Sequence, residues 1–343
     1  MESFAKHKSV GEPAGSKEAA ERHTEQNRTV GPTLRKRLIV TADDFGLTER
    51  VNEGSGLAHR NGIITSASLM ANGKAFESAI EILRKNENLD VGLHLNLTEG
   101  HSVSDPSSIS RLANRNGFLY PAPAELAMAI LRRKVRVSDI ELEIRAQPDK
   151  ILNTGVRVTH IDGHKHLHVA PSILNAIGRI APRYGIKAVR SIAERSPMLG
   201  FLLRRHKSAS AQILKQYASG RTLSAAFWIS HKMYGYRGLV TPSCIYGITQ
   251  TGFMDLDLMT AIVRNVSPGV SEIMFHPGYM DEQLEMTHTR LRLQREREVA
   301  MLISPALRDL LREHNIELIS YRDLVRDYEH SGHDPVFDHC SAI

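Results

Sequence analysis

The stretch HIDGHKHLH, residues 160–168, concentrates side chains that could do chemistry. It holds four histidines and one aspartate, in a chain of 343 residues with 17 histidines in all. Neutral imidazoles gathered in this way are typical ligands of zinc and related transition metals. One ion cannot bind all of them, so some must support the ligands, contact substrate or face solvent. The stretch predicts one wall of a metal site, and a solvated polar loop is the alternative.

The adjacent pair Asp43–Asp44 in TADDFG is the second candidate. Two neighbouring carboxylates that face one cavity repel each other, unless a cation neutralises one of them or its pKa rises. A divalent metal beside the pair would remove that repulsion. The alternative is that one aspartate caps the following turn while its neighbour is solvated.

Two histidines outside the cluster are weaker candidates when each is taken alone. His94 lies among apolar residues in GLHLNLTEG, where it is either a ligand or a core residue with its hydrogen bonds satisfied. His276 precedes Pro277, a stiff residue that would keep an acid or a base aimed. A polar loop histidine is the alternative for His276.

An arginine and a glutamate complete the candidates. Arg190 could hold Asp43 by charge-assisted hydrogen bonds, or it could pair with a surface acid. Glu99, followed by Gly100, could line the rim of a site or form an ordinary turn. Neither residue is specific by itself.

Short apolar runs alternate with segments of helical periodicity along most of the chain. Strands that are apolar without alternation predict a parallel sheet covered on both faces. The expected strands are residues 37–42, 65–71, 90–97, 156–162 and 185–191, followed by the runs CIYGI, VSEIMFHPG and IELIS. The expected helices run from Thr48 to Gly62, over 75–85, 123–134 and 138–152 (opened by Ser138), from Pro171, from Asp255, and as one long charged helix within 288–313.

This order predicts an α/β fold, with a closed or distorted (β/α) barrel preferred and an open doubly wound sheet second. The candidate residues all fall at the carboxyl ends of expected strands. Because those ends face one rim of a parallel barrel, residues far apart in sequence converge there. That convergence is a stronger indication of a site than any single motif.

Three segments fall outside the alternating pattern. Residues 1–34 combine charges with Ser, Gly, Pro and Gln, and are expected to be a disordered tail. Residues 329–343 are expected to be a flexible C-terminal tail, which leaves 35–328 as the barrel domain. Residues 196–242 mix aromatic, basic and small residues, and predict a helical insertion that serves as a lid or as an interface, for instance of a homodimer.

Composition excludes several classes of protein. The formal charge of +6 arises from short, scattered basic groups, which does not favour a nucleic-acid partner. The chain has no run of 18 apolar residues, so no membrane span is expected. Its two cysteines, Cys244 and Cys340, match no zinc or redox spacing, which favours a reducing compartment and a cytoplasmic location.

Five motifs occur in one order between residues 36 and 325: TADDFG, TSASLMANG, GLHLNLTEG, HIDGHKHLH and FHPGY. Together they resemble the YdjC-like carbohydrate deacetylases, a family that includes chitooligosaccharide deacetylase. The resemblance implies a distorted (β/α) barrel of the polysaccharide deacetylase type. It also implies hydrolysis of the N-acetyl group of an acetylated amino sugar or chitooligosaccharide, which releases acetate.

The resemblance further implies one divalent metal ion, Mg²⁺ or Zn²⁺, and roles for individual residues. The implied metal ligands are Asp44, His94 and His164, and the implied catalytic base is Asp43. The two aspartates could exchange these roles, because sequence does not show the directions of neighbouring side chains.

His276 is the implied acid partner, and Arg190 is the implied orienter of the base. Two other classes of protein stay open: a metal-dependent hydrolase of a different bond, such as a phosphoester, and a non-catalytic barrel scaffold. The remaining polar residues of the rim are assigned to substrate binding: His160, Asp162, His166 and Glu99.

Overall fold

The structure is a computed structural model that describes residues 35–194, 198–234 and 238–331. The predicted N-terminal tail, residues 332–343 of the predicted C-terminal tail, and Cys340 lie outside the described residues. Among the described helices, none combines the length and the apolar character that crossing a bilayer requires.

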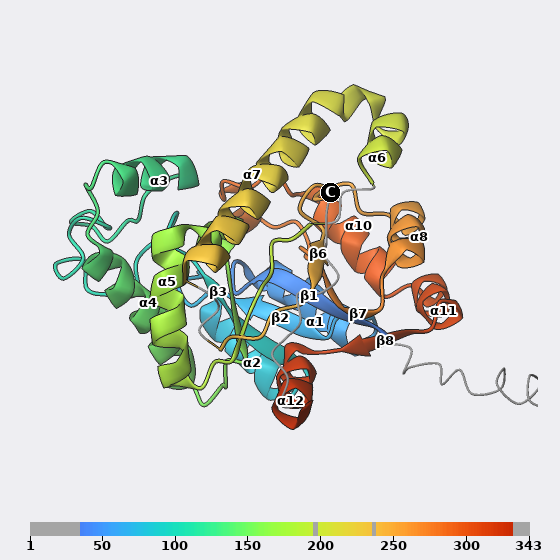
Figure 1. The fold of residues 1–343 in the computed structure, drawn as a ribbon, viewed down its shortest axis with the longest axis horizontal. Coiled ribbons are helices and arrows are strands. Elements are labelled where there is room, and N and C mark those ends of the chain that lie inside the picture. Colours follow the sequence, from blue (N-terminus) through green and yellow to red (C-terminus); the bar gives the residue numbers. More distant parts are fainter. Residues whose placement is uncertain (1–34, 195–197, 235–237, 332–343) are drawn as a thin grey trace, which may run out of the picture. The chain divides into compact units, whose positions relative to one another are not determined.

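A parallel sheet forms the centre of the described fold, with helices around it (Figure 1). Its strand order is β5-β4-β3-β2-β1-β7-β6, and β8 pairs with the beginning of β1. Isolated parallel bridges, Ala188 to Val240 and Glu194 to Ile245, connect the β5 edge to the chain that forms β6. The predicted distorted (β/α) barrel is therefore confirmed. The strands are β1 Lys36–Phe45, β2 Ser66–Leu69, β3 Asp90–Leu95, β4 His160–Gly163, β5 Ala188–Val189, β6 Cys244–Tyr246, β7 Gly269–Phe275 and β8 Ile316–Ile319.

The strands are buried on both faces, as their apolar sequences predict; only β8 has exposed positions in its middle. Helices cover the sheet, and their buried apolar side chains form one core with those of the strands. The α-helices are α1 Glu49–Arg60, α2 Phe76–Arg84, α3 Pro123–Leu131, α4 Val137–Leu152, α5 Pro171–Ile180, α6 Leu199–Arg205, α7 Ser210–Tyr234, α8 Leu256–Asn265, α9 Glu282–Glu285, α10 Leu293–Leu302, α11 Pro305–Glu313 and α12 Tyr321–Ser331. Three short 3-10 helices are η1 His164–Val169, η2 Ala181–Tyr184 and η3 Lys207–Ala209.

The ends of α1 follow the predicted capping residues. The Thr48 hydroxyl accepts a hydrogen bond from the backbone N–H of Val51 at 3.2 Å, which satisfies one free donor of the first turn. The helix ends at Arg60, two residues before Gly62. A Cβ atom at Gly62 would lie 2.3 Å from the Ala58 carbonyl oxygen, so the chain can leave the helix here only without a side chain.

Three predicted boundaries are wrong. Helix α4 begins at Val137, so Ser138 lies inside its first turn and does not cap it. The long charged helix expected within 288–313 is two helices, because Pro305 lacks the N–H that would continue α10. Helix α12 runs to Ser331, past the predicted end of the domain at 328.

Within the predicted insertion the described residues form α6, η3 and α7, and residues 238–242 after them are not helical. Helix α7 packs against α5 and η1. The Ser230 hydroxyl donates to the Val169 carbonyl oxygen at 2.8 Å, and the Ser224 hydroxyl donates to that of Ile192 at 2.6 Å. Phe227 is fully buried between these two contacts. One side of α7 is thereby fixed to the barrel.

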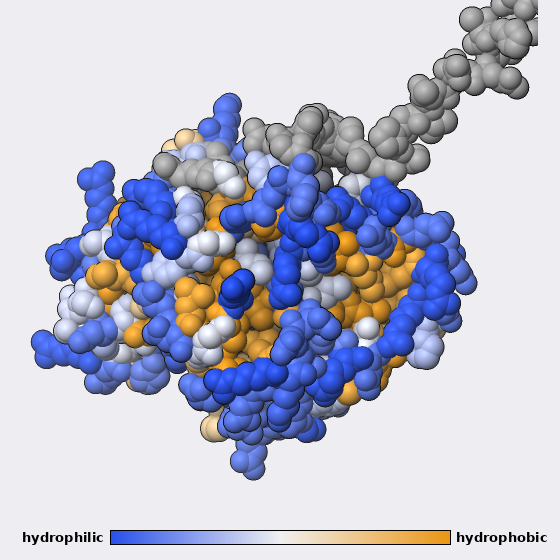
Figure 2. All heavy atoms as spheres, turned by 90° about the horizontal axis from the view of Figure 1, so that it is seen from below, coloured by the Kyte–Doolittle hydropathy of each residue, from blue (hydrophilic) through white to orange (hydrophobic). Residues whose placement is uncertain are grey.

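The end of the barrel where the strands begin is hollowed. A cavity of about 1030 Å³ lies beside the first residues of β3 and the residues preceding β4 and β5, with Leu89, Val158 and Arg322 in its wall. Figure 2, which views the molecule from the side of α12, shows apolar residues between hydrophilic ones. The candidate site lies at the opposite ends of the strands.

Asp90, at the start of β3, makes the stability of the fold depend on pH. Burial raises the pKa of Asp90 from its ordinary value of 3.8 to about 6, although the N–H and the charge of Arg322 lower it. Its stabilising contribution is therefore complete below about pH 3.8, and is lost as the pH rises through about 6. The carboxylate oxygen that accepts from Arg322 N–H also accepts from Thr159 at 3.0 Å, so an asparagine oxygen can replace it.

As the pH rises, the charging of Asp90 should lower the free energy of unfolding of the wild type by roughly 3 kcal/mol. Asp90→Asn cannot ionise, so it should not show this loss. The measurement is urea unfolding of wild type and variant from about pH 4 to about pH 8. We expect the variant to gain on wild type as the pH rises, whereas the exposed control Asp309→Asn keeps a constant difference. A constant difference for Asp90→Asn as well would contradict the assignment.

Candidate metal centre

A bulge in β1 directs the two adjacent aspartates. The strand predicted to end at residue 42 continues to Phe45 and contains both carboxylates. Its register with β2 shifts between Ala42 and Phe45, and Asp44 has a φ of 62°. Neighbouring residues of a regular strand point to opposite faces, and a bulge breaks that alternation. Both Asp43 and Asp44 can therefore serve one site, at the cost of a left-handed backbone that aspartate tolerates.

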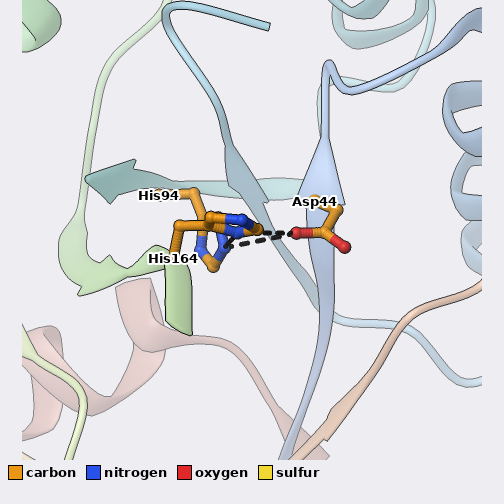
Figure 3. A group of neighbouring side chains, drawn as sticks. All are labelled: Asp44, His94 and His164. Atoms are coloured by element: carbon orange, nitrogen blue, oxygen red, sulfur yellow. Dashed lines mark hydrogen bonds and ion pairs between the residues drawn. The ribbon is translucent and has the colours of Figure 1, made fainter. Parts of the chain in front are cut away.

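Three side chains from distant segments meet beside this bulge (Figure 3). Asp44 comes from β1, His94 from β3, and His164 from the first residue of η1, directly after β4. Oδ1 of Asp44 lies 3.2 Å from Nδ1 of His164 and 3.5 Å from Nε2 of His94. The two histidine nitrogens are 3.3 Å apart. One ligand atom from each residue thus falls within 4.8 Å of the others, so the three could bind a common ion.

Each of these three side chains is held by a further partner. Oδ2 of Asp44 accepts a hydrogen bond from Nη2 of Arg295 at 2.6 Å, which leaves Oδ1 facing the histidines. Nδ1 of His94 lies 2.9 Å from Oδ1 of Asp162, which turns Nε2 toward the centre. Carboxylates of this kind fix the ring orientation of metal-ligating histidines. Nε2 of His164 lies 3.4 Å from Oε2 of Glu99.

Arg190, fully buried after β5, connects the carboxylates behind the centre. Its Nη1 and Nη2 donate to the two oxygens of Asp43, each at 2.7 Å. Nη1 also lies 2.5 Å from Oδ2 of Asp162, while Nε and Nη2 donate to Oε1 of Glu272 at 3.0 and 2.9 Å. A guanidinium that binds both oxygens of one carboxylate fixes its plane as well as its position. Asp43 is therefore aimed by Arg190.

The buried charges leave a deficit of positive charge. Four carboxylates (Asp43, Asp44, Asp162 and Glu272) face two guanidinium groups (Arg190 and Arg295), so four minus two leaves a formal charge of −2 once the histidines are neutral, as metal ligands must be. Burying uncompensated charge is expensive. A divalent cation held by the three donors would balance this charge, so the residues present fit a metal.

The two aspartates differ in pKa. Burial by itself would raise the pKa of Asp44, but Arg295 and hydrogen bonds from His164 and His94 hold it well below the usual range. Burial raises the pKa of Asp43, against the opposing charge of Arg190. Adjacent groups whose environments separate their pKa values in this way can take different catalytic roles. Asp44 is suited to remain an ionised ligand, and Asp43 is suited to accept a proton.

His94 is also set up for a cation. Burial would lower the pKa of His94, but the charge and hydrogen bond of Asp162 raise it to about 10. In a protein without metal this imidazole therefore keeps a proton. A cation at Nε2 would take the place of that proton, while the hydrogen bond from Nδ1 to Asp162 stays intact.

His160 and Asp162 are not placed for the substrate contacts predicted for them. His160 is fully buried, and its ring stacks on that of Tyr321 with centroids 3.7 Å apart. A Cβ on Gly92 of the neighbouring strand β3 would lie 2.2 Å from Nε2 of His160. The His160 ring therefore fits only because residue 92 has no side chain. Asp162, also fully buried, binds His94 and Arg190. Side chains that point inward fill a barrel of this kind, and these two do so.

Glu99 and His166, the other two residues predicted to bind substrate, are less buried than His160 and Asp162. Glu99 is half-buried, with a φ of 62°, and pairs with Lys165 as well as with His164. Lys165 and His166 both have positive φ values, 51° and 59°, so the chain turns sharply directly after His164. Strained backbone is common where a functional side chain must be aimed. Substrate contact by Glu99 and His166 stays a prediction.

His276 follows β7 at the same end of the sheet and is half-buried. Its backbone N–H donates to Oε2 of Glu298 at 2.6 Å, and Pro277 follows it. Burial lowers the pKa of His276 to about 4, although Asp44 and Asp43 raise it. Its imidazole is therefore neutral near neutral pH.

Sequence reasoning missed Glu272 and Arg295. Glu272 is a charged residue inside the apolar strand VSEIMF, and a charge in a strand expected to be buried on both faces could have indicated it. Besides Arg190, it accepts hydrogen bonds from Thr41 at 2.7 Å and from Tyr321 at 2.6 Å. Arg295 lies in the run QRERE on α10, where nothing in the sequence distinguishes it from the charged residues around it.

Comparison with known proteins shows the family of this chain. The sequence model of the YdjC-like protein family matches residues 37–313, and the chain belongs to this family. A carbohydrate deacetylase of Brevibacillus brevis is 30% identical over 84% of this chain and 99% of the relative. A carbohydrate deacetylase of Mus musculus is 29% identical over 84% of this chain and 95% of the relative.

A solved structure has the same fold. It is a protein of Enterococcus faecalis V583, described with reservation as a cellobiose-phosphate cleavage protein. The TM-score is 0.67 at 24% identity, over 84% of this chain and 99% of that chain. At this identity the likeness concerns the fold alone.

Proposed function

We propose that this chain is a metal-dependent carbohydrate deacetylase, which hydrolyses the N-acetyl group of an acetylated amino sugar or chitooligosaccharide and releases acetate. The observation that carries the proposal is the meeting of Asp44, His94 and His164 directly beside Asp43. Relatives named carbohydrate deacetylases, matched over nearly their whole lengths, support the same activity.

The three donors would hold one divalent cation. Two imidazole nitrogens and one carboxylate oxygen favour zinc or a similar transition metal over Mg²⁺, which prefers oxygen ligands. When bound, the cation supplies Lewis acidity that polarises the acetyl carbonyl and acidifies water.

Asp43 acts as the general base in this proposal. Its raised pKa favours proton uptake, and both of its oxygens are oriented by Arg190. The three carboxylates around Arg190 hold the guanidinium in place, so Asp43 keeps its direction while its charge changes. Proton removal from water by Asp43 starts the attack on the acetyl carbon.

His276 assists the departing sugar amine. Because its imidazole is neutral at rest, it has no spare proton to give at the beginning of the reaction. We place its contribution after the proton uptake by Asp43, when a proton must be passed on to the amine nitrogen as the C–N bond breaks. The hydrogen bond from its backbone N–H to Glu298, and Pro277 after it, keep its position fixed.

His276→Ala should lower kcat by about 100-fold or more and leave metal content unchanged, since His276 is not one of the three grouped donors. Steady-state acetate release gives kcat, and plasma emission spectroscopy gives the metal per chain. The exposed His288→Ala is the matched control and should behave as wild type. Loss of metal together with activity in His276→Ala would instead make it a ligand.

The test of the function is an acetate-release screen over acetylated amino sugars and their short oligomers. Purified protein is treated with a chelator, then reloaded with Zn²⁺, Mg²⁺ or no metal, and phosphate release from phosphoesters is measured in parallel. We expect acetate and free amine, only after metal is restored. Phosphate release without acetate would favour the phosphoester hydrolase, and a folded protein with neither activity would favour the scaffold.

The cellular location and the oligomeric state of the enzyme are further parts of this proposal. We assign the enzyme to the cytoplasm on the ground that its two cysteines, Cys244 and Cys340, match no disulfide, zinc or redox spacing. The described contacts do not require a second copy of the chain to complete the centre, so the homodimer stays a prediction.

A further inference from the structure

The insertion helices have an unusual charge pattern. Residues 198–234, which form α6, η3 and α7, contain no Asp or Glu. They contain six lysine and arginine residues: Arg204, Arg205, Lys207, Lys215, Arg221 and Lys232. Arg205 forms ion pairs with Asp255 and Asp257 of the α8 end. Among the described residues, Lys207, Lys215 and Lys232 have no ion-pair partner.

The outer face of α7 combines these charges with large apolar side chains. Leu214, Ile229 and Met233 are 49%, 54% and 60% exposed, and Lys215 and Lys232 are exposed beside them. At 3.6 residues per turn, all five fall within one arc of about 100°. Leu214 lies near the beginning of α7, and Ile229 and Met233 lie near its end, with the exposed Ala218, Thr222 and Ala225 between them on the same arc. We call this arc the stripe, and exposed apolar side chains of this size mark a surface that contacts something else.

The opposite face of α7 packs on the barrel, so the helix cannot turn to bury the stripe. Ile213, Gly220, Phe227 and Ser230 are buried against the barrel, and Ser230 is hydrogen-bonded to η1. Figure 1 shows α7 rising from beside α5 toward the upper right, with α6 at its far end. The stripe is therefore presented on a rigid support.

We propose that this face of α7 docks onto the surface of an anionic lipid bilayer. Helices that lie in a membrane interface combine apolar side chains, which enter the headgroup boundary, with lysines that meet anionic lipids. The face supplies both, and it has no acidic residue to repel the lipid. Helix α7 also packs on η1, whose first residue is His164, so docking would place the metal centre one helix away from the membrane surface.

Two other occupants fit the face less well. A second copy of the chain would bring the same face against itself, and its unpaired lysines would repel those of the partner. A nucleic acid takes basic residues with flat aromatic platforms, whereas the most exposed large residues here are aliphatic. The face therefore complements an anionic lipid bilayer, which has a negatively charged surface over an apolar interior.

The test is flotation of the full-length, metal-loaded protein with vesicles of phosphatidylcholine alone, or with about one-third phosphatidylglycerol. We expect binding to the anionic vesicles only, weakened by salt. The pair Lys215→Glu/Lys232→Glu should weaken it by about 30-fold or more, because each lysine near such a surface contributes about fivefold. Ile229→Ser/Met233→Ser should also weaken it, and what binding remains should be abolished by high salt.

A control pair, Arg183→Glu/Arg264→Glu, makes the same change in net charge at exposed positions outside the insertion. It should keep vesicle binding, and all three pairs should keep wild-type acetate release from a soluble substrate, which separates this proposal from that of the activity. Equal binding to neutral vesicles, no binding, or equal loss in the control pair would overturn the proposal. So would a dimer in light scattering that Ile229→Ser/Met233→Ser converts to a monomer.

Discussion

Asp43→Asn is expected to lower kcat by about 10³-fold while the protein keeps its metal. Asparagine has the size of aspartate and can still accept a hydrogen bond from Arg190, but it cannot take a proton from water. Loss of a general base costs 10²- to 10⁴-fold, and the raised pKa of Asp43 supports the role of base that we propose for it. Steady-state acetate release and metal content, measured on one preparation, check both halves of this expectation.

Asp105→Asn is the matched control, since Asp105 is exposed in the segment between β3 and α3. It should retain wild-type kcat. If Asp43→Asn kept kcat within tenfold of wild type, Asp43 would not be the base. If it lost metal to the same degree as Asp44→Asn, the two aspartates would share the ion and the division of roles would be wrong.

His94→Ala is expected to abolish both metal binding and turnover. The substitution removes one of three donors and leaves Asp162 without its imidazole partner, so a carboxylate next to Arg190 loses part of its neutralisation. We expect less than a tenth of a metal ion per chain after dialysis, and activity at background. Circular dichroism verifies that the variant is folded.

The same exposed histidine control, His288→Ala, should retain one metal ion per chain. Asp44→Asn should resemble His94→Ala, although the introduced amide oxygen could still accept from Arg295. Stoichiometric metal with full activity in His94→Ala would remove this histidine from the ligand set.

Sequence alone could predict which strand ends carry the site. A parallel barrel brings the carboxyl ends of its strands to one rim, so the positions of His94, His164 and Arg190 in the strand order were sufficient to expect them together. The pairing of Arg190 with Asp43 was also predicted, and the structure has it as a two-bond contact.

Sequence could not predict how deep each side chain lies or in which direction it points. His160 and Asp162 are two residues apart and share a strand face. The structure places the His160 ring on Tyr321 and the Asp162 carboxylate beside His94. The bulge that lets Asp43 and Asp44 serve one centre is a shift in register between strands, and a run of adjacent letters carries no trace of it. Arg295 reaches Asp44 from a helix 251 residues away in sequence.

The most direct measurement is anomalous X-ray diffraction from crystals of the protein reloaded with zinc, with data collected on both sides of the zinc absorption edge. We expect one anomalous peak per chain, within bonding distance of Asp44 Oδ1, His94 Nε2 and His164 Nδ1. Asp43 should stay bound to Arg190 and should not be a ligand. A peak elsewhere, or no peak at these three atoms in a protein that releases acetate, would contradict the proposed metal centre.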